Sequence, residues 1–507
     1  MSQHSYTPNN SSALPKDNKI QPDLAAKEQL LQVLRKAGKL TNEDNPKKTE
    51  KPKKHEELLK ALLEQIEPLD YREKAGLGED DKLTRKHYHV ITIEEVLKLA
   101  KQNNWGLCRH NDTVYLYNGS FWSMIEDGLL MSFLGEAGEK MGMDKYQARH
   151  YLEKDALVKQ FFSSAHMHVP IICESKVLVN LQNGTFEITD KRTKLRSFRA
   201  TDFLTYQLPF FYDPLAKAPL FEAYLNKVLP DKALQDILLE YLGYVFVTPG
   251  TLKLEKVLLL YGSGANGKSV FFEIVNALLG PENISCYSLQ SLTNDNSYSR
   301  AKLENILVNY GSEINGKLES SIFKQLASGE PVEARLPYGQ PFTLFRYAKL
   351  IFNCNELPKE VEHTNAYYRR FLIIPFNVTI PEGEQDKELA KKIIEKELSG
   401  IFNLALEGLY RLLSKKAFTH SPIIDNLVND YRQQSDSVQM FLEENQYSKS
   451  LSSTILIKDL YMVYKQYCLD DGYLPVSKSK LRKRLESAGI AVTRTSKSYA
   501  VFLSKPE

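Results

Sequence analysis

The sequence predicts a multidomain α/β protein whose central part is a parallel sheet with crossover helices. Two observations predict this fold. The chain has 507 residues, which is enough for about three domains. Between about residues 251 and 380, short apolar runs (KVLLLY, NILVNY, AKLIFN and FLIIPF) alternate with helical segments, as strands do in parallel sheets. The flanking segments have other patterns, so we expect separate domains on either side.

Residues 1–84 are predicted to form a charged, partly helical segment and linker. Apolar residues recur at helical spacing over residues 25–37 and 56–66, and the Lys-rich run between them is typical of a solvated tether. The whole chain has 66 Lys and Arg against 63 Asp and Glu, a net charge of only +3. Any nucleic-acid binding must therefore come from local basic patches.

Residues 85–250 are predicted to form an α+β domain. YLYNGSFW turns at Asn118-Gly119 and VLVNLQNGTFEI turns at Asn183-Gly184, and Asn-Gly between alternating residues favours a hairpin. Residues 221–246 are expected to be helical. Taken alone, this domain shows no chemistry.

Composition excludes several classes of protein. The five cysteines are far apart and form no CxxC pair, which argues against a zinc ribbon, an iron–sulfur cluster or a disulfide scaffold. No apolar run approaches the roughly 20 residues of a membrane span, and the N-terminus lacks the apolar region of a signal peptide. We expect a cytoplasmic protein with no membrane association.

The motif GSGANGKS fits the phosphate-binding pattern GxxxxGK[ST]. It follows the strand at 256–261 and opens the helix at 270–279, which favours a phosphate loop over a chance glycine-rich turn. Its glycines let the backbone approach ATP phosphates, Lys268 would neutralise the β and γ phosphates, and the Ser269 hydroxyl would bind Mg2+. The predicted nucleotide-binding residues are Gly262, Ser263, Gly264, Ala265, Asn266, Gly267, Lys268 and Ser269.

Later strands end in further candidate groups. Glu313 follows the strand at 305–310, where its carboxylate can polarise water or bind the metal. Asn355 follows the strand at 349–352 and could hold the attacking water, while Arg369 and Arg370 precede the strand at 371–376 and could act on a neighbour's nucleotide. Each alone is more often a loop or surface residue. Their order after a phosphate loop favours a catalytic set.

This order of motifs closely resembles the superfamily 3 helicases of phages, plasmids and poxviruses, of the primase-helicase type. The resemblance rests on GSGANGKSVFFEIVNALLG, SEI, KQLASGEPVEARLPYGQPF, AKLIFNCNELP and YRRFLIIPF, with YNGSFW and LLEYLGYVF upstream and DSVQMFLEEN downstream. It covers roughly residues 85–507. It implies an AAA+ ATPase domain over residues 251–425 and a winged-helix DNA-binding domain over residues 426–507.

The resemblance also implies a mechanism. ATP would be hydrolysed between the subunits of a ring, usually a hexamer, that moves 3′ to 5′ on single-stranded DNA during replication of a mobile element. Lys268 and Ser269 become the Walker A ligands, Glu313 the Walker B acid, Asn355 the sensor, and Arg369 or Arg370 the arginine finger. Ser312 replaces the second acid that many relatives carry. The first 80 or so residues are too short for a primase, so we expect another polypeptide to supply priming.

The family's DNA-contacting hairpin corresponds to residues 331–346. Arg335, Tyr338 and Arg346 offer cations and an aromatic face for a DNA backbone and its bases. Many relatives carry a Lys near the position of Pro337, and this sequence lacks it. The residue that contacts DNA at the tip of the hairpin therefore stays open. An ordinary surface hairpin is the alternative.

The C-terminal segment carries a basic helix and a strand pair, an arrangement that suits duplex DNA. A solvated helix on an oligomerisation domain is the alternative. The candidate DNA-binding residues there are Lys478, Lys480, Arg482, Lys483, Arg484, Arg494 and Lys497.

Three functions fit these patterns. An ATP-dependent DNA helicase uses all of the motifs. A non-unwinding AAA+ replication initiator or helicase loader would share the nucleotide site, and the hairpin at 331–346 separates the two. A P-loop kinase ranks last, because it has no use for the sensor, the paired arginines and the basic tail together.

Overall fold

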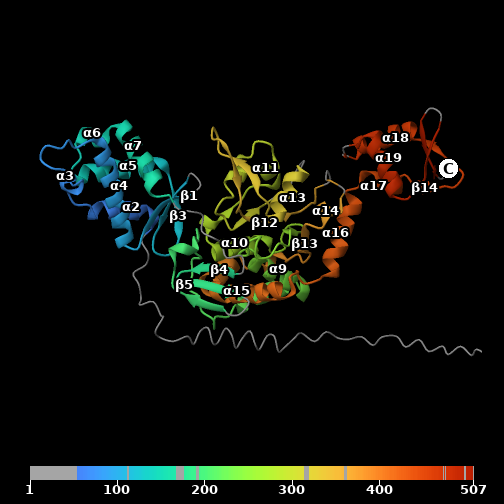
Figure 1. The fold of residues 1–507 in the computed structure, drawn as a ribbon. Coiled ribbons are helices and arrows are strands. Elements are labelled where there is room, and N and C mark those ends of the chain that lie inside the picture. Colours follow the sequence, from blue (N-terminus) through green and yellow to red (C-terminus); the bar gives the residue numbers. More distant parts are fainter. Residues whose placement is uncertain are drawn as a thin grey trace, which may run out of the picture.

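The computed structural model describes residues 54–110, 113–166, 176–189, 193–312, 314, 319–358, 362, 364–471, 473, 475–495 and 498–505. Along the chain, an N-terminal group of helices is followed by a central body and by a C-terminal group of helices (Figure 1). The helix predicted at 25–37 lies outside the described residues. Within them, no helix is both long and apolar enough to cross a bilayer.

The N-terminal group packs its helices over an antiparallel sheet of three strands in the order β1-β2-β3. The hairpin predicted at Asn118-Gly119 is confirmed, and the Asn118 side chain accepts hydrogen bonds from the amides of Ser120 and Phe121, both at 3.0 Å. The elements are α2 (His55–Gln65), α3 (Tyr71–Lys74), α4 (Arg85–Gln102), β1 (Gly106–His110), β2 (Thr113–Tyr117), β3 (Trp122–Ile125), α5 (Asp127–Met141), α6 (Lys145–Arg149) and α7 (Tyr151–Ser164).

A fully buried carboxylate ties α4 to α7. Glu153 accepts hydrogen bonds from Arg85 at 2.5 Å, from His89 at 2.6 Å and from Gln147 at 3.0 Å. Although burial opposes it, these donors hold the pKa of Glu153 below its ordinary value. The charge of Glu153 therefore contributes to the stability of this group.

A second antiparallel sheet and two helices lead into the central body. The hairpin predicted at Asn183-Gly184 is confirmed one residue earlier, with Gln182 and Asn183 in the turn and Gly184 paired with Leu181. The helix predicted over 221–246 is two helices, because Pro230 cannot continue the first and Asp231 caps the second by accepting from the Leu234 amide at 3.0 Å. The elements are β4 (Lys176–Leu181), β5 (Gly184–Thr189), β6 (Thr193–Arg196), η1 (Ala200–Asp202), α8 (Pro219–Val228) and α9 (Lys232–Tyr244).

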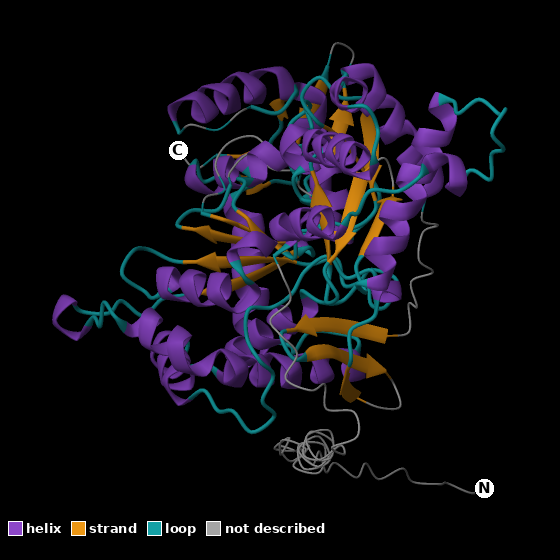
Figure 2. Ribbon diagram, turned by 90° about the vertical axis from the view of Figure 1, so that its left-hand side faces the viewer, coloured by secondary structure: helices purple, strands orange, loops and turns teal. Residues whose placement is uncertain are grey.

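The predicted parallel sheet is confirmed, with five strands in the order β13-β7-β12-β9-β8. Helices surround its strands (Figure 2). Its strands are β7 (Val257–Tyr261), β8 (Ile284–Ser285), β9 (Val308–Gly311), β12 (Lys349–Cys354) and β13 (Phe371–Pro375). Between them lie α10 (Lys268–Leu279), η2 (Pro281–Asn283), α11 (Leu289–Thr293), α12 (Tyr298–Ala301), α13 (Ser320–Ser328), the hairpin β10 (Val332–Arg335) and β11 (Pro341–Leu344), and α14 (Asn365–Tyr368).

The long helix α15 (Leu389–Lys415), which follows η3 (Glu382–Glu384), packs closely against α9. An ideal Cβ on Gly243 would lie 2.6 Å from Leu409 Cβ, and one on Gly408 would lie 2.6 Å from the Leu239 backbone. Glu397 of α15 also accepts hydrogen bonds from the Leu220 and Phe221 amides, at 3.0 and 2.9 Å, so it caps α8 from another helix. Glycines at both contact points let the two helices touch.

One hydrophobic cluster extends from the second antiparallel sheet through α8 and α9 into the parallel sheet and α15. It therefore crosses residue 250, where the sequence predicts a domain boundary, and that boundary stays a prediction. A second cluster fills the other face of the parallel sheet, beneath the hairpin strands.

The C-terminal group has a core of its own around Phe441, Tyr464, Leu481 and Leu485. The predicted basic helix and the strand pair after it are confirmed as α19 and β16–β17. Its strands pair in the orders β15-β17-β16 and β14-β18. After α16 (Pro422–Gln434) come α17 (Ser437–Glu444), β14 (Ser448–Lys449), β15 (Ile455–Leu456), α18 (Ile457–Asp470), α19 (Lys478–Ser487), β16 (Val492–Arg494), β17 (Tyr499–Val501) and β18 (Leu503–Ser504).

Candidate functional site

The phosphate-loop motif lies between β7 and α10, as its sequence predicts. Gly262 and Gly267 have φ values of 154° and 89°, and a Cβ on either would lie within 3 Å of a neighbour, Phe376 O or Val228 Cγ1. Only glycine fits at these two positions. A Cβ on Gly264 would meet nothing within 4 Å, so the loop has an open side where a ligand can approach.

Lys268 is buried at the first turn of α10. Its ammonium group donates to the carbonyl oxygens of Gly262 and Ser263, the latter at 3.2 Å. In the described part of the chain no carboxylate pairs with it, and burial lowers its pKa. A buried cation held on neutral carbonyls at a helix N-terminus suits an anion such as phosphate. Ser269 follows it with an exposed side chain.

Residues outside the motif hold the loop in shape. The Tyr224 hydroxyl of α8 donates to the Gly267 carbonyl at 2.9 Å. The Asn266 side chain donates to the Phe376 carbonyl at 2.9 Å, and the Ile380 amide donates to the Ala265 carbonyl at 2.8 Å. The sequence analysis missed Tyr224, because it lies in a helix far from the motif and no sequence pattern marks it.

Asn355 lies beside the entrance to the loop. Cys354 pairs with Tyr261 in the sheet, and the Cys354 carbonyl accepts from the Gly262 amide at 3.1 Å. Asn355 is the next residue, so it lies at the edge of the sheet where the phosphate loop begins, and its side chain is exposed. The side chain of Asn353 instead accepts from the Tyr310 hydroxyl at 3.1 Å. The neighbouring strand β9 also ends at this edge. Glu313, which follows it, lies outside the described residues.

Arg369 and Arg370 lie at the opposite edge of the sheet from the loop. The Arg370 carbonyl accepts from the Val257 amide at 2.8 Å, where β7 begins, whereas the loop starts where β7 ends. The five residues of β7 span roughly 17 Å. The length of this strand therefore separates the arginine pair from the phosphate loop of the same chain.

The two arginines differ in their surroundings. The Arg369 side chain is 56% exposed and pairs with Glu255 at 2.8 Å. The Arg370 side chain is 8% exposed; it lies 3.3 Å from the same Glu255 carboxylate, and it donates to the Ala366 carbonyl and to the Ser328 hydroxyl, the latter at 3.0 Å. Burial lowers the pKa of Arg370. Arg369 is thus the one whose side chain is available to another molecule.

The hairpin of β10 and β11 carries its most exposed residue at the tip. The strands pair from Val332–Leu344 to Arg335–Pro341, and Tyr338 is completely exposed with a φ of 62°. Arg335 donates to the Gly339 carbonyl at 2.9 Å, so part of its guanidinium stabilises the turn.

The base of the hairpin is held by a buried cation. Arg300 donates to the Glu333 carbonyl of β10 at 2.8 Å and to the carbonyls of Leu292 and Asn294, at 3.0 and 2.7 Å. Arg346 follows β11 and is exposed.

The predicted DNA-binding cations of the C-terminal group fall into two sets. Arg482 lies 4.2 Å from the ring centroid of Tyr499, and Arg484 pairs with Asp436 at 3.1 Å, so both contribute to packing between elements. The exposed set is Lys478, Lys480, Lys483 and Arg494. Lys497 lies outside the described residues.

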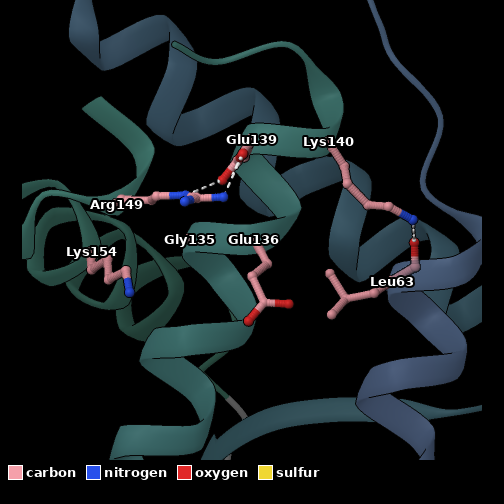
Figure 3. Close-up of a pocket in the computed structure, with 7 residues that line it drawn as sticks. All are labelled: Leu63, Gly135, Glu136, Glu139, Lys140, Arg149 and Lys154. Atoms are coloured by element: carbon pink, nitrogen blue, oxygen red, sulfur yellow. Dashed lines mark hydrogen bonds and ion pairs between the residues drawn. The ribbon is translucent and has the colours of Figure 1, made fainter. Parts of the chain in front are cut away.

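A small pocket on the N-terminal group contains none of the predicted site residues (Figure 3). Arg149 and Glu139 form a two-bonded ion pair across it, at 2.7 and 2.9 Å, and Lys140 donates to the Leu63 carbonyl at 2.6 Å. Glu136 and Lys154 also line the pocket, and no residue of the predicted nucleotide or DNA sites does.

Comparison with known families and proteins identifies the class. Residues 82–230 match the D5 N terminal like family, and residues 260–370 match a family of unknown function, DUF5906. The chain is 24% identical over 271 residues to the protein "Putative helicase L207/L206" of Acanthamoeba polyphaga mimivirus. It is 24% identical over 341 residues to "Putative helicase 121R" of Invertebrate iridescent virus 3. In these two segments the chain is similar to the D5 N terminal like family and to DUF5906, and its viral relatives are putative helicases.

The two viral matches cover 48% and 59% of this chain, but only 28% and 36% of the relatives. The chain thus spans about a third of the length of the curated relatives it matches. Two solved structures of the NrS-1 C-terminal region, both apo, are also similar, at 12% identity. Their TM-scores are 0.45 and 0.42, and they cover 81% and 80% of this chain and 98% and 97% of theirs.

Proposed function

We propose that this chain is an ATP-dependent DNA helicase that moves 3′ to 5′ on single-stranded DNA as a ring, usually of six subunits. We propose further that it serves the replication of a mobile element. The observation that carries the proposal is the placement of the phosphate loop and Arg369 at opposite edges of one sheet.

This placement favours hydrolysis between subunits. An arginine side chain is much shorter than the roughly 17 Å of β7, so Arg369 cannot reach the phosphates bound to its own loop. In a ring with head-to-tail contacts, the sheet edge of one subunit that carries Arg369 would face the phosphate loop of the next subunit. An arginine supplied in this way stabilises the charge of phosphoryl transfer and contributes about a thousandfold or more to turnover.

The remaining groups of the site have proposed roles. Lys268 would bind the β and γ phosphates, and Asn355 would position the attacking water or sense the γ phosphate. Ser269 and Glu313 would hold Mg2+, which neutralises phosphate charge when bound. The exposed Ser269 side chain beside an open glycine loop fits this assignment.

DNA would be bound at two places. The hairpin offers the exposed ring of Tyr338 to single-stranded DNA, with Arg335 and Arg346 for phosphates. The C-terminal group, as a winged helix, would bind duplex DNA through the exposed lysines of α19 and Arg494. Priming would come from another replication protein.

Strand displacement on tailed duplexes of both polarities, with ATP and Mg2+, tests the proposal. We expect unwinding from a 3′ tail and none with Lys268→Ala. DNA-stimulated ATP turnover without displacement on either tail would refute the helicase and favour an initiator or loader. Absence of ATP turnover would refute the nucleotide site itself.

A further inference from the structure

A cleft of about 540 Å3 lies where the N-terminal group meets the central body. Its walls come from β1 and β2, from β4, from the segments 201–206 and 245–249, and from the segments 304–307 and 343–349. The predicted ATP site contributes no residue to it. Hydrogen bonds fix its walls, since Asn305 donates to the Tyr115 hydroxyl at 3.0 Å and the Trp122 amide donates to the Leu204 carbonyl at 2.8 Å.

The cleft has an excess of positive charge. Lys176, Arg346 and Lys349 line it, and in the described part of the chain no carboxylate lies within ion-pair distance of any of them. Lys349 is half-buried, and its Nζ lies 4.1 Å from the ring centroid of Tyr244. A cation that is withdrawn from water without an anionic partner is costly, and a bound anion would offset that cost.

Two carboxylates also line the cleft, so its three cations face two acidic groups. Asp202 already pairs with Arg196, at 2.8 and 2.9 Å. Glu304 is half-buried without an ion-pair partner among the described residues, and its desolvation raises its pKa.

Aromatic surface accompanies the cations. Phe345 lines the cleft with 63% of its surface exposed, beside Arg346 in sequence, and the buried rings of Phe203 and Tyr206 also line it. Cations for phosphate together with an exposed aromatic ring for a base are the combination that binds single-stranded nucleic acid. A site for inorganic phosphate alone would not need the ring.

The cleft is continuous with the DNA hairpin. Phe345 and Arg346 come directly after β11, the strand that returns from the tip at Tyr338. We propose that the cleft binds a nucleotide unit of single-stranded DNA next to the hairpin, with Arg346 and Lys349 at phosphates and Phe345 against a base. This inference rests on the proposed function and extends the DNA path onto the D5 N-terminal-like domain.

Binding of a fluorescent oligo(dT) to the full chain, measured over a range of salt, tests the proposal. We expect Lys349→Gln and Lys176→Gln to weaken binding and to reduce the salt slope, by about 0.7 for each phosphate that the variant no longer neutralises. Phe345→Ala should weaken binding about fivefold or more. The matched control is Lys396→Gln, an exposed lysine of α15 with no ion pair in the described residues, which should behave as wild type. Unchanged affinity and slope in all three cleft variants would overturn the proposal.

A second measurement avoids mutation, because Lys349 is half-buried and its replacement could disturb folding. Ultraviolet cross-linking of wild-type chain to an oligonucleotide with 5-iododeoxyuridine should give adducts on peptides that contain Phe345 and residues 201–206. Adducts confined to Tyr338 and the C-terminal group would overturn the proposal. Loss of the cleft adducts in excess thymidine monophosphate, at unchanged oligonucleotide affinity, would show a site for free nucleotides and would also overturn it.

The two proposals fail separately. If wild-type chain hydrolyses ATP but displaces no strand, the helicase function is wrong, while cleft adducts would still show the DNA site. If strands are displaced and no cleft adduct forms, the helicase stands and the cleft proposal is wrong.

Discussion

Arg369 and Arg370 are adjacent in sequence, and their different burial predicts opposite effects on stability and catalysis. Arg370→Ala removes donors to Ala366 and Ser328, and hydrogen bonds of a charged group are worth about 1.5–3 kcal/mol each. The cost of burying the guanidinium offsets part of this, so we expect a net loss of about 2 kcal/mol. At about 2–4 °C per kcal/mol, the thermal midpoint should fall by about 4–8 °C.

Arg369→Ala should leave the midpoint nearly unchanged. Its ion pair with Glu255 involves a side chain that is 56% exposed, and such pairs contribute at most about 1 kcal/mol. ATP turnover, by contrast, should fall about a thousandfold or more, since the finger is lost from every interface. Circular dichroism melting and phosphate release on the same samples measure both effects.

Mixing two inactive variants tests whether the arginine acts on a neighbour. In a ring assembled from equal amounts of Arg369→Ala and Lys268→Ala subunits, about a quarter of the interfaces join an intact loop to an intact finger. Turnover should therefore recover to about a quarter of the wild-type value. No recovery in rings shown to be mixed would refute action between subunits. A large loss of thermal stability with Arg369→Ala would refute its assignment as the exposed arginine that contributes little to folding.

Three further changes test the structure. Tyr338→Ala should weaken oligo(dT) binding about fivefold or more in a fluorescence titration, because a base loses its stacking partner, and unchanged affinity would argue for an ordinary surface hairpin. Gly408→Ala should lower the thermal midpoint, since a Cβ 2.6 Å from the Leu239 backbone costs more than the gain of about 1 kcal/mol in helix propensity; a raised midpoint would contradict the close packing. Glu153→Gln should be less stable than wild type near neutral pH. Because the pKa of Glu153 is lowered on folding, its contribution to stability is lost as pH falls below about 4. The thermal midpoints of wild type and Glu153→Gln should therefore converge at low pH. A difference that stays constant with pH would contradict a lowered pKa.

Local patterns in the sequence predicted the parts of the fold that depend on neighbouring residues. Both Asn-Gly pairs lie where a hairpin turns, although in the second hairpin Gly184 already pairs with Leu181, and the apolar runs form the strands of the parallel sheet. The phosphate loop was recognisable because its glycines lie at fixed spacing. At Gly262 and Gly267 the backbone has positive φ values, which favour glycine. Residues 221–246 are largely helical as expected, but Pro230 divides them into two helices.

Features that depend on distant residues could not be predicted. The bond from Tyr224 to Gly267 joins residues 43 positions apart, and Glu397 caps α8 from 176 and 177 positions away. The sequence pattern Arg-Arg is the same for Arg369 and Arg370, and only burial separates them. The role of Glu313 stays a prediction, because it lies outside the described residues.

The contacts that α8 makes have a consequence for anyone who divides this chain into pieces. A fragment that starts at residue 251 would keep the whole Walker A sequence and lose Tyr224 and Val228, the two side chains that define the space around Gly267. It would also leave the Glu397 carboxylate without the helix end that it caps. A fragment meant to keep the phosphate loop in shape should therefore begin upstream of α8, and any exchange of the phosphate-loop segment between related chains should carry α8 and α9 along with it.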